Sequence, residues 1–464
     1  VSLGLGGYRV LAGRRLRSDL EQARQLVAAH RFDAARSVLA AQARGRSTPA
    51  EVAYLLGVCE HVLGRPDAAL AAWARVPVGS DFDTKAKLAR AQTLVGDFGR
   101  FAEAEPLLEQ ALRGSGPEAF QARYALSQLY FYEGRIDEMR RLLREAWNRS
   151  PEPVGDLRDL FRIDSAAIAI EEVKAAIEPA ARRAPDDDRV WMAQANVATL
   201  TGQFDEARAR LDACLRRRPG DLAVWLLKLR LARAENRPDE TREAFARVPA
   251  DRLLPAEIDD LRGWLAASAG DVNGERMALE HLLTVYPGAT RALERLAVMA
   301  IEAGQPERAA HFRRSKGEID RIGERYMRRI EDKSPLDQPE QFATLASQAD
   351  ALGRRFEARG WWTLALRGRP GEPAYLDALA RLDRHPEPVV PAALVAAKLG
   401  AKPEFRDDAT PAGLVFRYDN GRSRERQLPE TSGGGVALFD YDGDGWLDVY
   451  LVQGGGPFPP RPEN

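Results

Sequence analysis

The chain has 464 residues, 45% hydrophobic and 30% charged, and its 68 basic and 69 acidic side chains give a formal net charge of −1. This length exceeds one compact core and predicts several domains or an elongated repeat array, while the balanced charge argues against nucleic acid as a partner. The two cysteines, Cys59 and Cys214, form neither a Cys-x-x-Cys motif nor a disulfide framework. They are predicted to be small apolar core residues.

Residues 1–17, VSLGLGGYRVLAGRRLR, are weakly apolar and end in a group of arginines. The run is shorter than the about 20 apolar residues that span a bilayer. Two interpretations stay open: the tail of an anchor that begins before Val1 and tethers the protein to a membrane, or a plain lead-in.

Residues 18–383 follow a period of 34 residues. Turn-forming glycines recur at one or two periods, at Gly134, Gly202, Gly270 and Gly304. Asn236 stands where the intervening glycine is missing, and Asn is the other residue that tolerates a left-handed turn. Prolines fall 17 residues after turn positions, at Pro151, Pro185, Pro219, Pro287 and Pro370. Glycine permits a tight turn between antiparallel helices and proline ends a helix or opens the next, so each unit is predicted to be helix, turn, helix.

Residues between the turns have the spacing of packed helices. A small residue five positions after the turn lets two helices approach closely, at Ala35, Ala69, Ala207, Ala309 and Ala358. Large residues fill the gaps at Trp191 and Trp225, eleven before a turn, and at Leu39, Trp73, Leu143, Leu211 and Trp362, nine after. Since such a pair cannot bury its apolar face alone, neighbouring pairs are predicted to stack into an α-solenoid. About ten turns are expected, near residues 30, 64, 98, 134, 168, 202, 236, 270, 304 and 353.

These positions resemble tetratricopeptide repeats, as in VWMAQANVATLTGQFDEARARLDACLRRRPGD. The resemblance implies a mainly α fold with a protein or peptide partner in the concave groove lined by the first helix of each unit. The carboxylate-clamp set known from the family cannot be matched residue by residue, so no groove residue is predicted. Three irregularities stand out: an off-register third unit, a degenerate stretch at 152–187, and a step from Gly304 to Gly353 that is 15 residues too long. The long step predicts a lengthened helix.

No catalytic constellation is recognisable. The five histidines are scattered, at His30, His61, His281, His311 and His385. No HExxH, GxxxxGK[ST], GxSxG or CxxCH pattern occurs, so the chain is predicted not to be an enzyme and no catalytic residue is named. The arginines at 216–218 are expected to be solvated cations at the end of a helix, where they complement its dipole.

A proline-rich linker is predicted at 384–404, followed by a β domain at 405–464. Hydrophobic residues there alternate as in short strands, at Leu414 and Phe416, at Val436 and Leu438, and at Leu447, Val449 and Leu451.

The sequence DYDGDGWLD within this domain has the spacing of a calcium loop. Asp440, Asp442, Asp444 and Asp448 take positions 1, 3, 5 and 9, and Trp446 would contribute its carbonyl at position 7. Four carboxylates this close repel one another without a cation, and oxygen ligands favour Ca²⁺ over Zn²⁺. An EF-hand is excluded because position 12 is Leu451 and the flanks are predicted strands. A plain Asp-Gly hairpin turn explains the dipeptide but not the four-aspartate spacing.

Strand, loop and strand together resemble the FG-GAP or VCBS repeat, and residues 405–464 resemble the start of a cartilage-acidic-protein (ASPIC/UnbV-type) propeller. The resemblance implies structural calcium in a β-propeller of ~4 to 8 blades, of which this chain supplies little more than one, so the sequence is expected to be a fragment. The leading hypothesis is a non-enzymatic scaffold, a tetratricopeptide solenoid joined to a calcium-binding propeller at the cell envelope or outside the cytoplasm. The alternatives are an enzyme whose active site lies in the rest of the propeller, and a calcium-dependent adhesion or carbohydrate-binding module.

Overall fold

The computed structural model describes residues 2–44, 48–114, 116–147, 150, 152–165, 170–332, 334–384, 436–439 and 448–451. The chain divides into two compact units, Val1–Gly400 and Ala401–Asn464. The described part of the first unit is helical, and that of the second is one strand pair. The predicted bounds 1–17, 18–383, 384–404 and 405–464 stay predictions.

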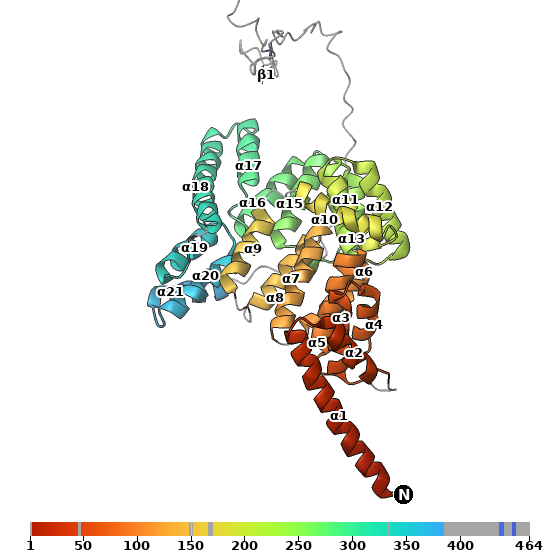
Figure 1. Ribbon diagram of the computed structural model, residues 1–464. Coiled ribbons are helices and arrows are strands. Elements are labelled where there is room, and N and C mark those ends of the chain that lie inside the picture. The colour runs from red at the N-terminus through yellow and green to blue at the C-terminus, as the bar shows by residue number, and fades with distance from the viewer. Residues whose placement is uncertain are drawn as a thin grey trace, which may run out of the picture. The chain divides into compact units, whose positions relative to one another are not determined.

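The first unit is a succession of antiparallel helix pairs (Figure 1). In chain order its elements are α1 Ser2–Ala28, α2 Phe32–Gln42, α3 Ala50–Val62, α4 Pro66–Trp73, α5 Asp83–Thr93, the π-helix η1 Leu94–Phe98, α6 Phe101–Leu112, α7 Pro117–Tyr132, α8 Ile136–Ala146, α9 Pro153–Ser165, α10 Ile170–Arg183, α11 Asp188–Leu200, α12 Phe204–Arg217, α13 Leu222–Ala234, α14 Pro238–Arg247, the 3-10 turn η3 Ala250–Arg252, α15 Pro255–Ser268, α16 Val272–Val285, α17 Thr290–Glu302, α18 Pro306–Glu331, α19 Pro339–Ala351, α20 Arg355–Gly368 and α21 Pro373–Arg384. The mainly helical, solenoid-like prediction is confirmed.

Helix α1 contains most of the predicted lead-in. Its C-terminal half packs on α2 and α3, with Ala23 buried and Leu20 and Leu26 partly buried. Among the helices that the structure describes, none combines the length and the hydropathy needed to cross a bilayer. The membrane tether remains a prediction.

The predicted turns are confirmed wherever the structure describes them. Each contains a residue with positive φ: His30, Gly64, Gly99, Gly134, Gly202, Asn236, Gly270, Gly304 and Gly353. The expected turn near residue 168 lies outside the described residues. At Gly202 the N–H groups of Gly202 and Gln203 donate to the carbonyls of Thr199 and Ala198, which is the Schellman arrangement that ends a helix on a left-handed residue. Asn236, at φ 57°, replaces glycine as predicted.

The off-register third unit has a local cause. Its first helix ends in the π-helical segment η1, and the turn falls on Gly99 rather than residue 98. A π-helical turn accommodates one extra residue within an α-helix. The insertion is therefore absorbed before the turn, and α6 still packs on α5.

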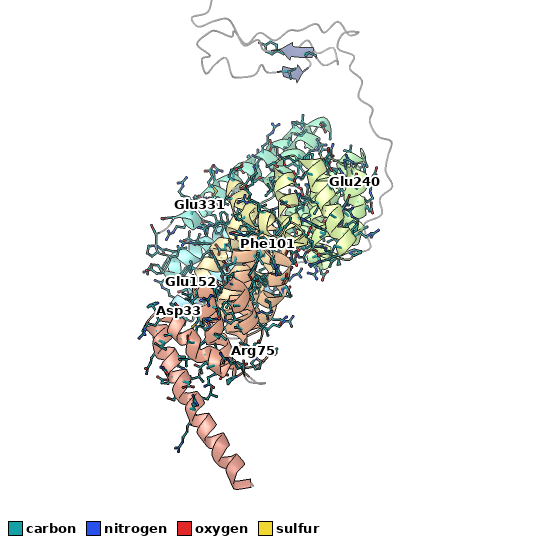
Figure 2. The ribbon with its side chains drawn as sticks, turned by 45° about the vertical axis from the view of Figure 1, so that its right-hand side comes forward. Asp33, Arg75, Phe101, Glu152, Glu240 and Glu331 are labelled. Atoms are coloured by element: carbon teal, nitrogen blue, oxygen red, sulfur yellow. The ribbon has the colours of Figure 1, made fainter. Side chains whose placement is uncertain are left out.

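The packing positions also match the prediction. The five alanines after the turns are fully buried, and Leu39, Trp73, Leu143, Leu211 and Trp362 are buried as well. Trp191 and Trp225 are half-buried, and their indole Nε1 groups donate to the carbonyls of Pro185 and Pro219. Phe101, labelled in Figure 2, is another core residue at 2% exposure.

The 15-residue excess is confirmed as a lengthened helix. Helix α18 has 26 residues, and its two ends join different core clusters. Phe312 packs with α16 and α17, whereas Tyr326 and Ile330 pack with α19 and α20. Figure 1 shows α17 beside the first part of α18, with α19 beyond its far end.

The degenerate stretch at 152–187 is where the regular stacking breaks. Helix α10 packs with α6, α7 and α11, while α9 packs in another cluster with α18 and α20. Leu157 of α9 leaves so little room that a Cβ on Gly360 of α20 would lie 2.7 Å from it. Arg158 Nη2 donates to the carbonyl of Asp332 at 3.0 Å. A simple solenoid has contacts only between neighbouring repeats, but here the array closes on itself.

In the second unit, β1 Val436–Phe439 and β2 Asp448–Leu451 pair antiparallel, with Val436 opposite Leu451 and Phe439 opposite Asp448. The two strands on either side of the aspartate loop are confirmed. The predicted strand at Leu414 and Phe416 lies outside the described residues.

Candidate functional site

Equivalent positions on successive first helices form a row, here called the first-helix ladder. It consists of the residues six places before four consecutive turns: Asn196 on α11, Arg230 on α13, Trp264 on α15 and Val298 on α17. Because each is one 34-residue period from the next, the four occupy the same place in their units. Asn196 is buried, Arg230 and Trp264 are half-buried, and Val298 is 41% exposed.

The buried end of this ladder binds a turn of its own chain. Asn196 Nδ2 donates to the carbonyl of Tyr132 at 3.3 Å, and Arg230 Nη1 donates to the carbonyl of Gly134. Arg230 Nη2 also lies 3.9 Å from Asp137 Oδ1. A Cβ on Gly134 would lie 2.5 Å from the Asn196 side chain. The α7–α8 corner, residues 132–137, is therefore bound through its backbone by first helices two and three units further along.

Buried charges hold this corner in place. Arg135 Nη1 donates to Glu133 at 2.8 Å and to Glu105 at 2.5 Å. Arg189 Nε donates to the other oxygen of Glu105 at 2.7 Å, and its Nη1 reaches Asp221 at 2.8 Å. Arg135, Arg189, Glu105 and Glu133 are all less than one tenth exposed, so the pairs are largely shielded from water.

Glu133 is the unusual member of the network. It is completely buried, and its Oε1 has no hydrogen-bond partner in the described part of the chain. Burial raises the pKa of the Glu133 carboxyl to about 8, against the charge of Arg135 and with a further rise from Glu105. The side chain is therefore largely protonated at neutral pH.

A second site lies where the array closes. A pocket of about 170 Å³, here called the seam pocket, is lined by α8, the end of α9, the start of α15, the end of α16 and the α19–α20 turn. Four arginines face three carboxylates in it: Arg140, Arg144, Arg354, Arg355, Asp164, Glu257 and Glu357. Its apolar walls include Val285, Tyr286 and Phe356.

Two of these arginines hold the carboxylates. Arg140 Nη2 donates to Asp164 at 2.8 Å and lies 3.2 Å from Glu257. Arg354 Nη1 donates to Glu357 at 2.7 Å.

Glu357 has a second donor. Its Oε2 accepts from Tyr326 Oη at 2.6 Å, and Trp361 Nε1 donates to the same hydroxyl at 2.9 Å. Burial raises the pKa of Glu357, although Arg354 and Tyr326 oppose the shift. The carboxylates of the seam pocket are thus engaged by protein groups.

The predicted calcium ligands are only partly described. Asp440, Asp442, Asp444 and Trp446 lie outside the described residues, and Asp448 is the first residue of β2. Within the ranges that the structure describes, no three His, Cys, Asp or Glu side chains are grouped to hold a metal. Calcium therefore stays a prediction.

Both cysteines are core residues, as predicted. Cys59 and Cys214 are buried and unpaired with each other, and burial raises their pKa to about 11 and about 12. These thiols are accordingly protonated and unreactive at neutral pH. The arginines at the end of α12 also match their prediction, since Arg216 and Arg217 are exposed.

The tetratricopeptide repeat family model matches residues 20–79, 89–150 and 201–257. These segments are tetratricopeptide repeats. The tetratricopeptide array thus includes the α7–α8 corner and the second helix that follows Asn196. The matched segments lie within 18–383, and the FG-GAP, VCBS and ASPIC/UnbV resemblance of residues 405–464 remains a prediction.

Several solved structures are similar to the chain. The APC/C hetero-tetramer Cut9-Hcn1 has 13% identity and a TM-score of 0.31, covering 79% of this chain and 77% of its own. PilW, a type IV pilus biogenesis factor, has 18% identity and a TM-score of 0.29, covering 50% and 100%. A tetratricopeptide repeat protein from Parabacteroides merdae has 12% identity and a TM-score of 0.25, covering 57% and 99%. Comparison with curated proteins gave no match.

Proposed function

We propose that the tetratricopeptide array is a protein-interaction scaffold, and that the exposed part of the first-helix ladder receives the partner. The observation that carries the proposal is the contact of Asn196 and Arg230 with backbone carbonyls of the α7–α8 corner. Side chains of this register already bind polypeptide at the buried end of the ladder. Trp264 and Val298 continue the same register, and Ile301 one turn along α17 is 47% exposed. An apolar surface of this kind fits an apolar segment of a protein partner.

Site-specific photo-crosslinking tests the scaffold proposal. A photoreactive residue at Val298 of the full chain should form one discrete adduct in the cells that produce it. The matched control is Arg313 on α18, an exposed second-helix residue of the same unit. The substitution Trp264→Ala should reduce the Val298 adduct at least about fivefold, the loss that ~1 kcal/mol of binding energy predicts. Equal adducts from Val298 and Arg313 would contradict a first-helix interface.

We also propose that the DYDGDGWLD loop binds Ca²⁺ and stabilises its hairpin as the start of a propeller. In support, β1 and β2 bring Phe439 and Asp448, the residues at the two ends of the loop, opposite each other. Alternate oxygens of a loop closed in this way can converge on one cation.

Calorimetric titration of the full chain with Ca²⁺ tests the second proposal. Asp442→Ala and Asp444→Ala should abolish the binding heat, while the control Asp377→Ala, an exposed residue of α21, should leave it unchanged. Identical heats in wild type and both loop variants would end the calcium proposal.

A further inference from the structure

The seam pocket combines positive charge with apolar walls. Arg140, Arg144, Arg354 and Arg355 outnumber the three carboxylates that line it. Two of the arginines are well shielded, since the side chains of Arg140 and Arg354 are each 9% exposed. In such a partly desolvated recess, an interaction between opposite charges is stronger than at an open surface.

The carboxylates of the pocket are engaged by the protein itself. Asp164 accepts from Arg140, and Glu357 accepts from Arg354 and Tyr326. Glu257 caps its own helix, because its Oε2 accepts from the N–H of Leu254 at 2.8 Å. Their charge is thereby directed to these partners and not into the free volume.

The size and walls of the pocket indicate the kind of ligand. About 170 Å³ is more than one water requires, about 30 Å³ of liquid volume, so an oxyanion with a few carbon atoms fits. Guanidinium groups present paired N–H donors that match phosphate oxygens. Val285 and Phe356 supply an apolar wall for the organic part.

We infer that the seam pocket binds a phosphomonoester, with the phosphate on the arginines and the organic group against the apolar wall. The site joins α8 and α9, α15 and α16, and α19 and α20, three segments far apart in the sequence. A ligand there would contact all three and favour the closed arrangement of the array. This inference does not depend on the proposed scaffold function, because its ligand can be tested as a small molecule.

Calorimetric titration of the full chain with O-phosphoserine is the first test. The double variant Arg144→Gln/Arg355→Gln should weaken binding at least tenfold, and Arg140 and Arg354 are kept because they hold buried carboxylates. The control Arg313→Gln/Arg314→Gln removes the same charge from exposed positions of α18 and should stay within about twofold of wild type. Equal affinities in the wild type and both double variants would overturn the inference.

Three other probes determine the ligand class. Glutamate, which offers only carboxylates, should bind at least tenfold more weakly than O-phosphoserine, and equal binding would overturn the inference. Inorganic phosphate should bind more weakly than O-phosphoserine, because it leaves the apolar wall uncovered. A phosphoserine peptide that binds better than O-phosphoserine would identify a phosphorylated protein as the source, and equal binding would identify a free metabolite.

Hydrogen exchange on the wild type keeps the inference testable if the double variant does not fold. Saturating O-phosphoserine should slow amide exchange in residues 254–257 and 353–357, the first turns of α15 and α20 that border the pocket. Unchanged exchange in both segments would contradict binding in the seam pocket.

Discussion

The turns at Gly134 and Gly202 have nearly the same backbone conformation, with φ of 73° and 75°, but opposite surroundings. No atom lies within 4 Å of a Cβ placed on Gly202, whereas on Gly134 it would lie 2.5 Å from Asn196. Glycine is required at Gly202 by the left-handed conformation alone, and at Gly134 by the close approach of α11 as well. The same local motif therefore serves as an ordinary surface turn in one unit and as a buried contact in another.

The largest expected difference between the two turns comes from adding one methyl group. Gly202→Ala should cost about 1 kcal/mol of unfolding free energy from the left-handed conformation. Gly134→Ala should cost about 3 kcal/mol or more, because the methyl group also collides with Asn196. Denaturant unfolding of both variants measures the difference. Equal losses would show that the α7–α8 corner is not held against α11 in solution.

A pH-dependent difference is expected at Glu133. The unfolded carboxyl loses its proton near pH 4.5 and the folded one near pH 8. The folded state therefore binds more protons in this interval, so the contribution of Glu133 to stability is complete below pH 4.5 and is lost as pH rises to about 8.

Glu133→Gln tests this because the amide stays neutral at every pH. Relative to wild type, the variant should gain on the order of 2 kcal/mol in unfolding free energy between pH 5 and pH 8. Thermal unfolding across this range measures the gain. The control Glu103→Gln, at a side chain 62% exposed, should show a constant difference from wild type. A constant difference for Glu133→Gln as well would refute the raised pKa.

The smallest expected effect separates two arginines of α13. Arg230→Ala removes the donor to the Gly134 carbonyl and should cost about 1.5 kcal/mol, the typical value for a hydrogen bond from a charged group. Arg233 pairs with Asp260 at 2.6 Å, with both side chains more than one third exposed, so Arg233→Ala should cost about 0.5 kcal/mol. Denaturant unfolding compares them, and a larger loss for Arg233→Ala would contradict the role of Arg230.

Features within one unit could be predicted from the sequence. The 34-residue period located the turns, the alanines at close helix contacts and the long helix α18, because each depends on residues close together in the chain. The equivalence of Asn196 and Arg230 was also present in that period, one step apart. What they contact was not, since Tyr132 and Gly134 lie 64 and 96 residues before them.

The seam pocket had no sequence signal of its own. Its lining comes from α8, α9, α15, α16 and α20, which meet only because α9 leaves the regular stack. The degenerate stretch at 152–187 marked where the repeat fails but not where α9 would pack. A period describes the local unit, whereas closure depends on the summed rotations between units.

Helix α18 gives the array a mechanical property. Its 26 residues extend about 39 Å as one continuous rod, with Phe312 fixed among α16 and α17 and Tyr326 fixed beside Glu357. A helix without a break resists bending, so its two ends cannot shift independently. A partner that tilts α17 at Val298 would therefore apply leverage at Tyr326, next to the carboxylate that Arg354 holds in the seam pocket.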